Sequence, residues 1–336
     1  MKDKTMLNFI YVNPALINQK TKENIRESEI RKLTQLKQDG YILVGLEMTT
    51  DELAKYCDIN VDPQHTDQKI TQSCVKEICL NHEQLFKDLL PFEHQKFIFL
   101  TNRVDLDSIS AYIVANSIVK NEKISYNRAI QQINAHDTFS SAHWEKEKSI
   151  EEAFNPNNQT KALASTIKPF MVTKENIENV ERFIYHSTVD EAIMETYRNT
   201  QQSIINKAKS GEIKTYKNAG IAFVETTLPC ATDIGYCYAP IVVATNPKMR
   251  SADGTTYRKI SICQHEEGYV DLRKVKEALC QKEEGWGGSL TFIGSPQGVD
   301  TTLSLKEIQK IVYQNLTLEY KQKVSSSSLP DTSLEK

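Results

Sequence analysis

Two hydrophobic patterns alternate along the first third of the chain. Continuous apolar runs, which are typical of strands buried on both faces, are separated by segments whose apolar residues recur every three or four positions, as on one face of a helix. The strand-like runs are YILVGLEMT, DINVD (which stops at Pro63) and KFIFL, and helical patterns cover residues 20–38, 73–90 and 107–120. Strands that alternate with helices predict a mainly parallel sheet flanked by helices.

The pattern changes in the second half of the chain. A long, polar helical segment is followed by three strand-like stretches (IAFVETT, IGYCYAPIVVATN and RKISICQ), a helix, a glycine-rich stretch and a last helix. We therefore expect a first domain over residues 1–170, a helical linker over 171–213, a second domain over 214–324 and a disordered tail over 325–336. The predicted fold class is α/β, with a mainly parallel sheet flanked by helices and a smaller α/β second domain.

Composition narrows the classes of function. The chain of 336 residues is 39% hydrophobic and 25% charged, with a net charge of −3, so we expect a globular protein that binds neither long nucleic acid nor membranes. The N-terminus lacks the apolar core of a signal peptide, and we expect a cytoplasmic protein. Seven cysteines without a CxxC pair argue against a disulfide framework or a zinc ribbon.

Candidate metal ligands follow two of the predicted strands. Asp105 and Asp107 stand between the KFIFL strand and the next helix, and two ionised carboxylates so close together favour a cation. The alternative is a helix N-cap plus a loop carboxylate. Asp62 and His65 lie at the end of the DINVD strand and add a carboxylate and an imidazole, the mixture that a two-metal hydrolytic site requires. Asp137, at the end of a helical stretch, is a further candidate ligand.

The glycine-rich stretch GWGGSLTFIGSPQG is the candidate substrate-binding segment. Gly287, Gly288 and Gly294 let backbone N–H groups approach a bound phosphate, and Ser295 can add a hydrogen bond. Arg258 is a candidate contact for an anionic substrate. The alternatives are a structural loop for the glycines and a solvated hairpin for Arg258.

Three of these motifs together resemble the DHH phosphoesterase superfamily, in which an aspartate-rich metal domain is followed by a smaller DHHA1 domain that holds the substrate. NRVDLDSISA is similar to the DxD motif, INVDPQHT to the Asp-His-His motif, and GWGGSLTFIGSPQG to the glycine-rich signature of the second domain. The chain departs from the pattern where Pro63 and Gln64 separate Asp62 from His65, and where Gln264 and His265 stand in place of a phosphate-binding arginine.

The resemblance implies a metal-dependent phosphoesterase that acts on a short oligonucleotide or small nucleotide, with Mn²⁺ (or Mg²⁺) as the metal and a homodimer as a possible state. Asp105, Asp107 and His65 are then the expected catalytic residues, and Asp62 and Asp137 complete the expected metal ligands. The alternative is a catalytically inactive nucleotide-binding or regulatory protein of the same fold, which the departures from the motifs favour.

Overall fold

The computed structural model divides the chain into two units. Unit 1 comprises Met1–Ser141 and Pro156–Gln201, and unit 2 comprises Ala142–Asn155 and Gln202–Lys336. The structure describes residues 8–18, 21–64, 72–89, 95–122, 125–138, 144, 146–251 and 253–326.

Unit 1 is built on a four-stranded, entirely parallel sheet of order β1-β4-β2-β3. Its strands are β1 (Phe9–Tyr11), β2 (Tyr41–Leu46), β3 (Ile59–Val61) and β4 (Lys96–Thr101). Its helices are α1 (Ile25–Gln38), α2 (Asp51–Ala54), α3 (Cys74–Leu85), the 3₁₀ helix η1 (Lys87–Leu89), α4 (Leu106–Val119), α5 (Arg128–Thr138), α7 (Gln159–Ala164), α8 (Lys174–His186) and the first part of α9 (Glu191–Lys209).

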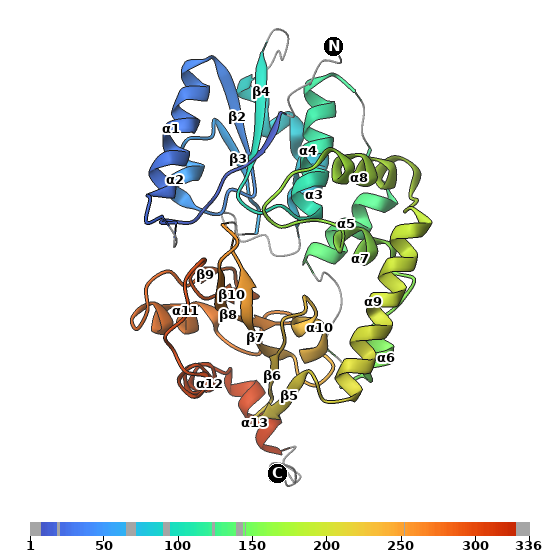
Figure 1. Cartoon of the computed structure of the whole chain (residues 1–336), viewed down its shortest axis with the longest axis vertical. Helices are drawn as coiled ribbons and strands as arrows, with labels where there is room; N and C mark the ends of the chain where they lie inside the picture. Colours follow the sequence, from blue (N-terminus) through green and yellow to red (C-terminus); the bar gives the residue numbers. More distant parts are fainter. Residues whose placement is uncertain are drawn as a thin grey trace. The chain divides into compact units, whose positions relative to one another are not determined.

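Both faces of this sheet are covered by helices, as Figure 1 shows. Successive residues of β2 point to opposite faces, so that Leu43 packs with α1 and α2, whereas Val44 packs with α3 and α4. Burial on both faces explains why β2 and β4 are continuously apolar. The fold class predicted from the sequence is confirmed.

Unit 2 contains a six-stranded mixed sheet of order β5-β6-β7-β8-β10-β9, in which only β6 and β7 pair in parallel. Its strands are β5 (Lys214–Asn218), β6 (Ile221–Glu225), β7 (Ile241–Arg250), β8 (Thr256–Gln264), β9 (Gly287–Gly288) and β10 (Phe292–Gly294). Its helices are α6 (Ile150–Ala153), the end of α9, α10 (Ala231–Gly235), α11 (Leu272–Cys280), α12 (Leu305–Gln314) and α13 (Leu318–Ser326).

The helices of unit 2 lie on both faces of its sheet. Residues of α11, α12 and α13 form one apolar cluster with β6, β7, β8 and β10, and α10 and the end of α9 form another with β6 and β7. The segment IGYCYAPIVVATN is not one strand, because its first residues end α10 and β7 begins at Ile241.

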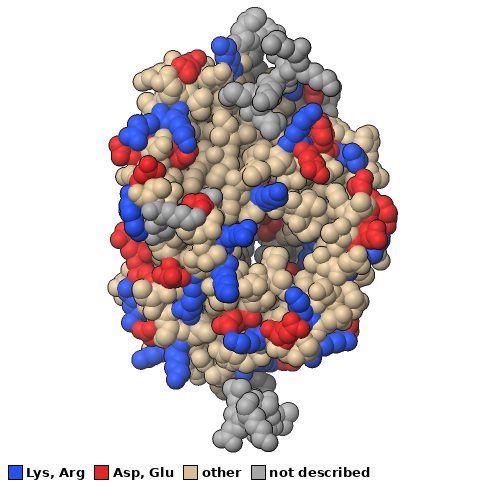
Figure 2. Space-filling model, in the orientation of Figure 1, with Lys and Arg blue, Asp and Glu red and all other residues tan. Residues whose placement is uncertain are grey.

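The surface carries charges of both signs. Figure 2 shows acidic and basic side chains interspersed over the visible face, which agrees with the small net charge of −3. No helix in the described part of the chain is long and apolar enough to cross a membrane.

Candidate metal centre

The carboxyl ends of β2, β3 and β4 lie at one edge of the parallel sheet. The chain passes from β2 to β3 through α2 on one face and returns to β4 through α3 on the other face, so the strand order reverses between β2 and β4. Open α/β sheets bind ligands at such a reversal, beyond the carboxyl ends of the strands. The first residues after β2 and β4 therefore occupy the position where a ligand is expected.

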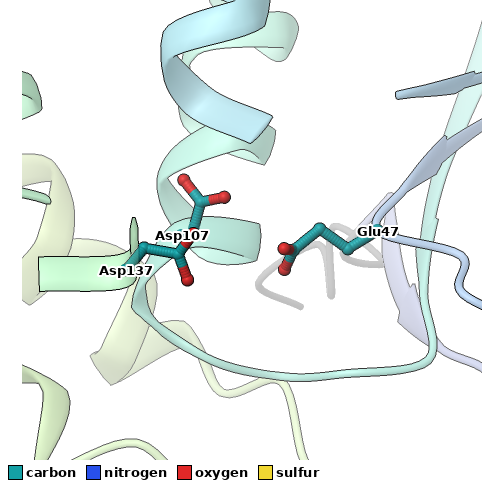
Figure 3. A group of neighbouring side chains, drawn as sticks. All are labelled: Glu47, Asp107 and Asp137. Carbon is teal, nitrogen blue, oxygen red and sulfur yellow. The ribbon is translucent and has the colours of Figure 1, made fainter. Parts of the chain in front are cut away.

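Three carboxylates meet at this position (Figure 3). Glu47 directly follows β2, Asp107 lies in the first turn of α4, and Asp137 lies in the last turn of α5. Each offers one oxygen, and these oxygens lie within 4.8 Å of one another. Three carboxylate oxygens this close together can coordinate one divalent cation such as Mg²⁺ or Mn²⁺, for which carboxylate oxygens are preferred ligands.

The side chain of Glu47 is buried, and its backbone has an unusual conformation. Its φ angle of 55° is in the left-handed region, which glutamate seldom adopts, and its N–H donates to the carbonyl oxygen of Val61 at 3.0 Å. The side chain is only 1% exposed, and its Oε2 has no hydrogen-bond partner among the described residues. A buried carboxylate oxygen without a partner carries a desolvation penalty that a bound cation would offset.

The loop that carries Glu47 is tied to the loop after β4. In the orientation that satisfies both of its amide atoms, Asn102 donates to the carbonyl oxygen of Glu47 at 2.8 Å and accepts from the N–H of Thr50 at 3.2 Å. Asn102 is itself buried. The two loops that flank the reversal of strand order are therefore fixed to each other.

Asp107 is held by the start of α3. Its Oδ2 accepts from the N–H of Cys74 at 2.6 Å, and its Oδ1 accepts from the N–H of Val75 at 3.1 Å. These are N–H groups of the first turn of α3, which have no partner within the helix. Asp107 thus has a structural role, and the same bonds fix the direction in which its remaining lone pairs point.

Asp137 is the most accessible of the three carboxylates. It is partly exposed, and the side-chain amide of Gln64, in the loop after β3, donates to its Oδ2. Glu47 and Asp107, in contrast, are both 1% exposed.

The electrostatics of the cluster favour a cation. Burial raises the pKa of Glu47, and the negative charges of Asp105, Asp107 and Asp137 raise it further. Burial likewise raises the pKa of Asp107, followed by the charges of Asp137 and Asp105, and the two N–H groups of α3 oppose the shift. In the absence of a metal, these side chains repel one another and resist ionisation.

Asp105 lies beside the cluster, but its contacts are those of a helix cap. Its Oδ1 accepts from the N–H of Ser108 at 2.9 Å, and its own N–H donates to the hydroxyl of Ser108 at 3.0 Å, which is a capping box at the start of α4. Arg103 Nε lies 2.8 Å from Asp105 Oδ2. Of the two aspartates of the DLD segment, Asp107 belongs to the group of three carboxylates, and Asp105 pairs with an arginine.

The other two predicted ligands follow β3. Asp62 is 4% exposed at the same sheet edge, outside the group of three carboxylates. His65 lies outside the described residues.

The predicted substrate-binding glycines belong to strands. Gly287 and Gly288 form β9, and Gly294 ends β10. Gly288 has a φ angle of 137°, and a side chain there would collide with the carbonyl oxygen of Phe292. The glycine at this position is therefore required by the turn between β9 and β10.

The other two predicted substrate contacts, Ser295 and Arg258, make hydrogen bonds to residues of unit 2. Ser295 is buried, and its hydroxyl accepts from the N–H of Ile260 at 3.0 Å. Arg258 donates from its guanidinium to the carbonyl oxygen of Leu303 at 3.0 Å.

Sequence reasoning missed Glu47. The residue stands inside the run YILVGLEMT, which was predicted to be one strand, but β2 ends at Leu46. An acidic residue at the end of a continuously apolar run is the signal that could have identified it, because such runs predict parallel strands whose ends face ligands.

Comparisons with known proteins give distant structural similarities. No family profile matches the chain, and no curated protein sequence matches it. Among solved structures, an exopolyphosphatase-related protein from Bacteroides fragilis is 11% identical over 92% of this chain and 80% of its own, with a TM-score of 0.36. A pGpG-specific phosphodiesterase, PggH from Vibrio cholerae, is 10% identical over 86% of this chain and 99% of its own, with a TM-score of 0.33. Similarities of this size do not establish a shared fold.

Proposed function

We propose that the chain is a metal-dependent phosphoesterase whose metal centre includes Glu47, Asp107 and Asp137. The observation that carries this proposal is the meeting of three carboxylates from three separate elements at the reversal of strand order, where one buried oxygen lacks a hydrogen-bond partner among the residues that the structure describes. Without a cation, burial and mutual repulsion disfavour the ionised forms of these carboxylates, which a bound cation would stabilise.

The proposed ligand set extends along the same sheet edge. Asp62 and His65 follow β3, and Asp105 follows β4, so they are proposed as further ligands if a second ion is present. Mn²⁺ fits a set that mixes carboxylates with an imidazole, and Mg²⁺ fits the carboxylates alone. Such an ion supplies a Lewis acid for the phosphoryl group and lowers the pKa of the attacking water.

The protein side chains have distinct roles in this proposal. Asp107 is rigidly oriented by α3 and fixes the geometry of the centre. The Arg103 side chain is 55% exposed and makes its ion pair with Asp105 through Nε. Its terminal nitrogens are therefore proposed to bind phosphate oxygens in the bidentate manner typical of arginine. The proposed substrate is a phosphate ester of a short oligonucleotide or small nucleotide.

The test is hydrolysis by the full-length chain of bis(p-nitrophenyl) phosphate and of the dinucleotide pApA, with Mn²⁺, with Mg²⁺ and with EDTA. Glu47→Gln and Asp137→Asn should each lower kcat by at least about 100-fold, since removal of even an outer partner of a metal ligand costs 10-fold to 100-fold. Glu178→Gln, at an exposed position on α8, is the matched control.

Turnover that survives EDTA, or that Glu47→Gln leaves intact, would overturn the proposed centre. An absence of turnover on both substrates, together with intact nucleotide binding, would favour the alternative of a binding or regulatory protein.

A further inference from the structure

One part of the sheet face in unit 2 combines a lysine, an aromatic ring and bare glycine backbone. In the antiparallel pairing of β8 with β10, Ser261 lies opposite Gly294, and in the pairing of β10 with β9, Gly294 lies opposite Gly287. Residues directly opposite each other, and residues two apart on one strand, share a face. Lys259 and Phe292 are therefore on the same face as these three residues.

This part of the face differs from the rest of the sheet. On the opposite face, Ile260, Ile262 and Ile293 pack in the apolar cluster with α11 and α12. On the same face, the apolar cluster with α10 takes its strand residues from β6 and β7. Phe292 is 43% exposed. The end of the sheet formed by β8, β10 and β9 thus presents a large aromatic side chain outside either cluster.

The ammonium group of Lys259 and the ring of Phe292 both lie close to the same glycine, Gly294. A Cβ atom built on Gly294 would lie 3.1 Å from Lys259 Nζ and 3.8 Å from Phe292 Cε1. Lys259 donates to the carbonyl oxygen of Ser295, and it forms no ion pair with an acidic side chain in the described part of the chain. A side chain at position 294 would press on the ammonium group of Lys259, whereas its Cβ would lie at an ordinary contact distance from Phe292.

The neighbouring Arg258 cannot replace Lys259 in this arrangement. Adjacent strand residues point to opposite faces, so Arg258 shares the face of Ile260, and its guanidinium contacts the carbonyl oxygen of Leu303. The strand geometry thus separates the two cations of the RK pair and leaves Lys259 beside the exposed ring.

We propose that Lys259 and Phe292 form a nucleotide-binding site in which the ammonium group contacts a phosphate and the ring stacks on a base. The identification of this nucleotide as the substrate rests on the function proposed above, but the site itself does not. A chain of phosphates alone would use the lysine and leave the aromatic ring without a role. The arrangement therefore favours a ligand that carries both a phosphate and a base.

Burial of Lys259 without an acidic partner supports an anionic ligand. Burial lowers the pKa of Lys259 to about 8, and no charged neighbour contributes to the shift. A phosphate beside the ammonium group would supply the missing negative charge and favour the protonated form.

The test is equilibrium binding by isothermal titration calorimetry at pH 7, with the full-length chain in EDTA so that metal-dependent hydrolysis does not consume the probe. The probes are pApA and tripolyphosphate, which has no base. Lys259→Gln should weaken the binding of both probes by about 10-fold to 100-fold. Phe292→Leu should weaken pApA binding by about 5-fold to 100-fold and leave tripolyphosphate binding unchanged.

Two further variants separate this site from general effects of charge and folding. Lys259→Arg keeps the charge and should bind pApA within about threefold of the wild-type protein. Lys274→Gln removes a lysine that is 69% exposed on α11 and should bind like the wild type. Circular dichroism of each variant shows whether it is folded.

The proposal is overturned if pApA does not bind in EDTA, if folded Lys259→Gln binds like the wild type, or if Arg258→Gln alone abolishes binding. Equal losses of both probes in Phe292→Leu would overturn the stacking of a base. Binding that follows the prediction in a protein without hydrolytic activity would refute the function proposed above and leave this site intact.

Discussion

The Glu47→Gln substitution removes one charge from the cluster of Glu47, Asp107 and Asp137 with little change in size. In the metal-free protein, the variant should be at least as stable as the wild type. The reason is that Glu47 is 1% exposed, its Oε2 has no hydrogen-bond partner among the described residues, and burial raises its pKa. The amide removes the repulsion from the neighbouring carboxylates.

The response to metal should change in the opposite direction. Mn²⁺ at 100 times its Kd stabilises the folded state by about 2.7 kcal/mol. Each kcal/mol shifts the midpoint of a domain of this size by about 2–4 °C, so the wild-type midpoint should rise by about 5–10 °C. A 100-fold weaker site is only half-filled at the same Mn²⁺ concentration. Its stabilisation falls to about 0.4 kcal/mol, which corresponds to a shift of about 1–2 °C.

The assay is thermal unfolding of the full-length chain, followed by far-ultraviolet circular dichroism, in EDTA and in excess Mn²⁺. Glu178→Gln, which removes a charge from the exposed surface of α8, should keep the full wild-type shift. An unchanged Mn²⁺ shift in Glu47→Gln would refute the role of Glu47 as a ligand. The absence of any shift in the wild type would refute the metal centre itself.

Three further predictions follow from the contacts described above. Asp107→Ala should lower the stability of the protein in EDTA by about 1–3 kcal/mol, measured by urea unfolding, because the N–H groups of Cys74 and Val75 lose their acceptor. An unchanged midpoint would contradict this structural role. Burial and neighbouring charges raise the pKa values of Glu47 and Asp107. The stability that these two groups contribute in EDTA is therefore complete below about pH 4, near their unfolded pKa, and is lost as the pH rises through their folded pKa values. Thermal midpoints in EDTA should fall as the pH rises, and Glu47→Gln should flatten this decline. The binding of pApA should weaken as the pH rises through about 8, where Lys259 loses its proton, and Lys259→Arg should bind equally well on both sides of that pH.

The parallel sheet of unit 1 was predictable because its signals are strong and local. The continuous apolar runs of β2 and β4 and the helical periodicity that follows them identify buried parallel strands. The boundaries were less accessible: β2 ends at Leu46 because Glu47 adopts a left-handed φ angle, and nothing in its immediate neighbours predicts that conformation.

The assignment of the two aspartates in the DLD segment needed the tertiary structure. The sequence places both at a helix start, where a carboxylate can cap the helix or face a ligand. Asp105 caps α4, and Asp107 reaches α3, a contact between residues separated by about thirty positions that periodicity cannot show.

The choice between Arg258 and Lys259 illustrates a similar limit. Both cations stand in one predicted strand, and alternation assigns them to opposite faces without indicating which face is covered. The packing of Ile260 and Ile262 against α11 and α12 decides the question, and it leaves Lys259 on the face with Phe292.

The central claim, that Glu47, Asp107 and Asp137 hold a divalent cation, is tested most directly by locating the ion. Crystals of the full-length chain grown with Mn²⁺ would be measured at the manganese absorption edge. We predict an anomalous peak with one oxygen of each of the three carboxylates within about 2.0–2.5 Å of it. A peak elsewhere on the chain, or no peak at a saturating Mn²⁺ concentration, would contradict the claim.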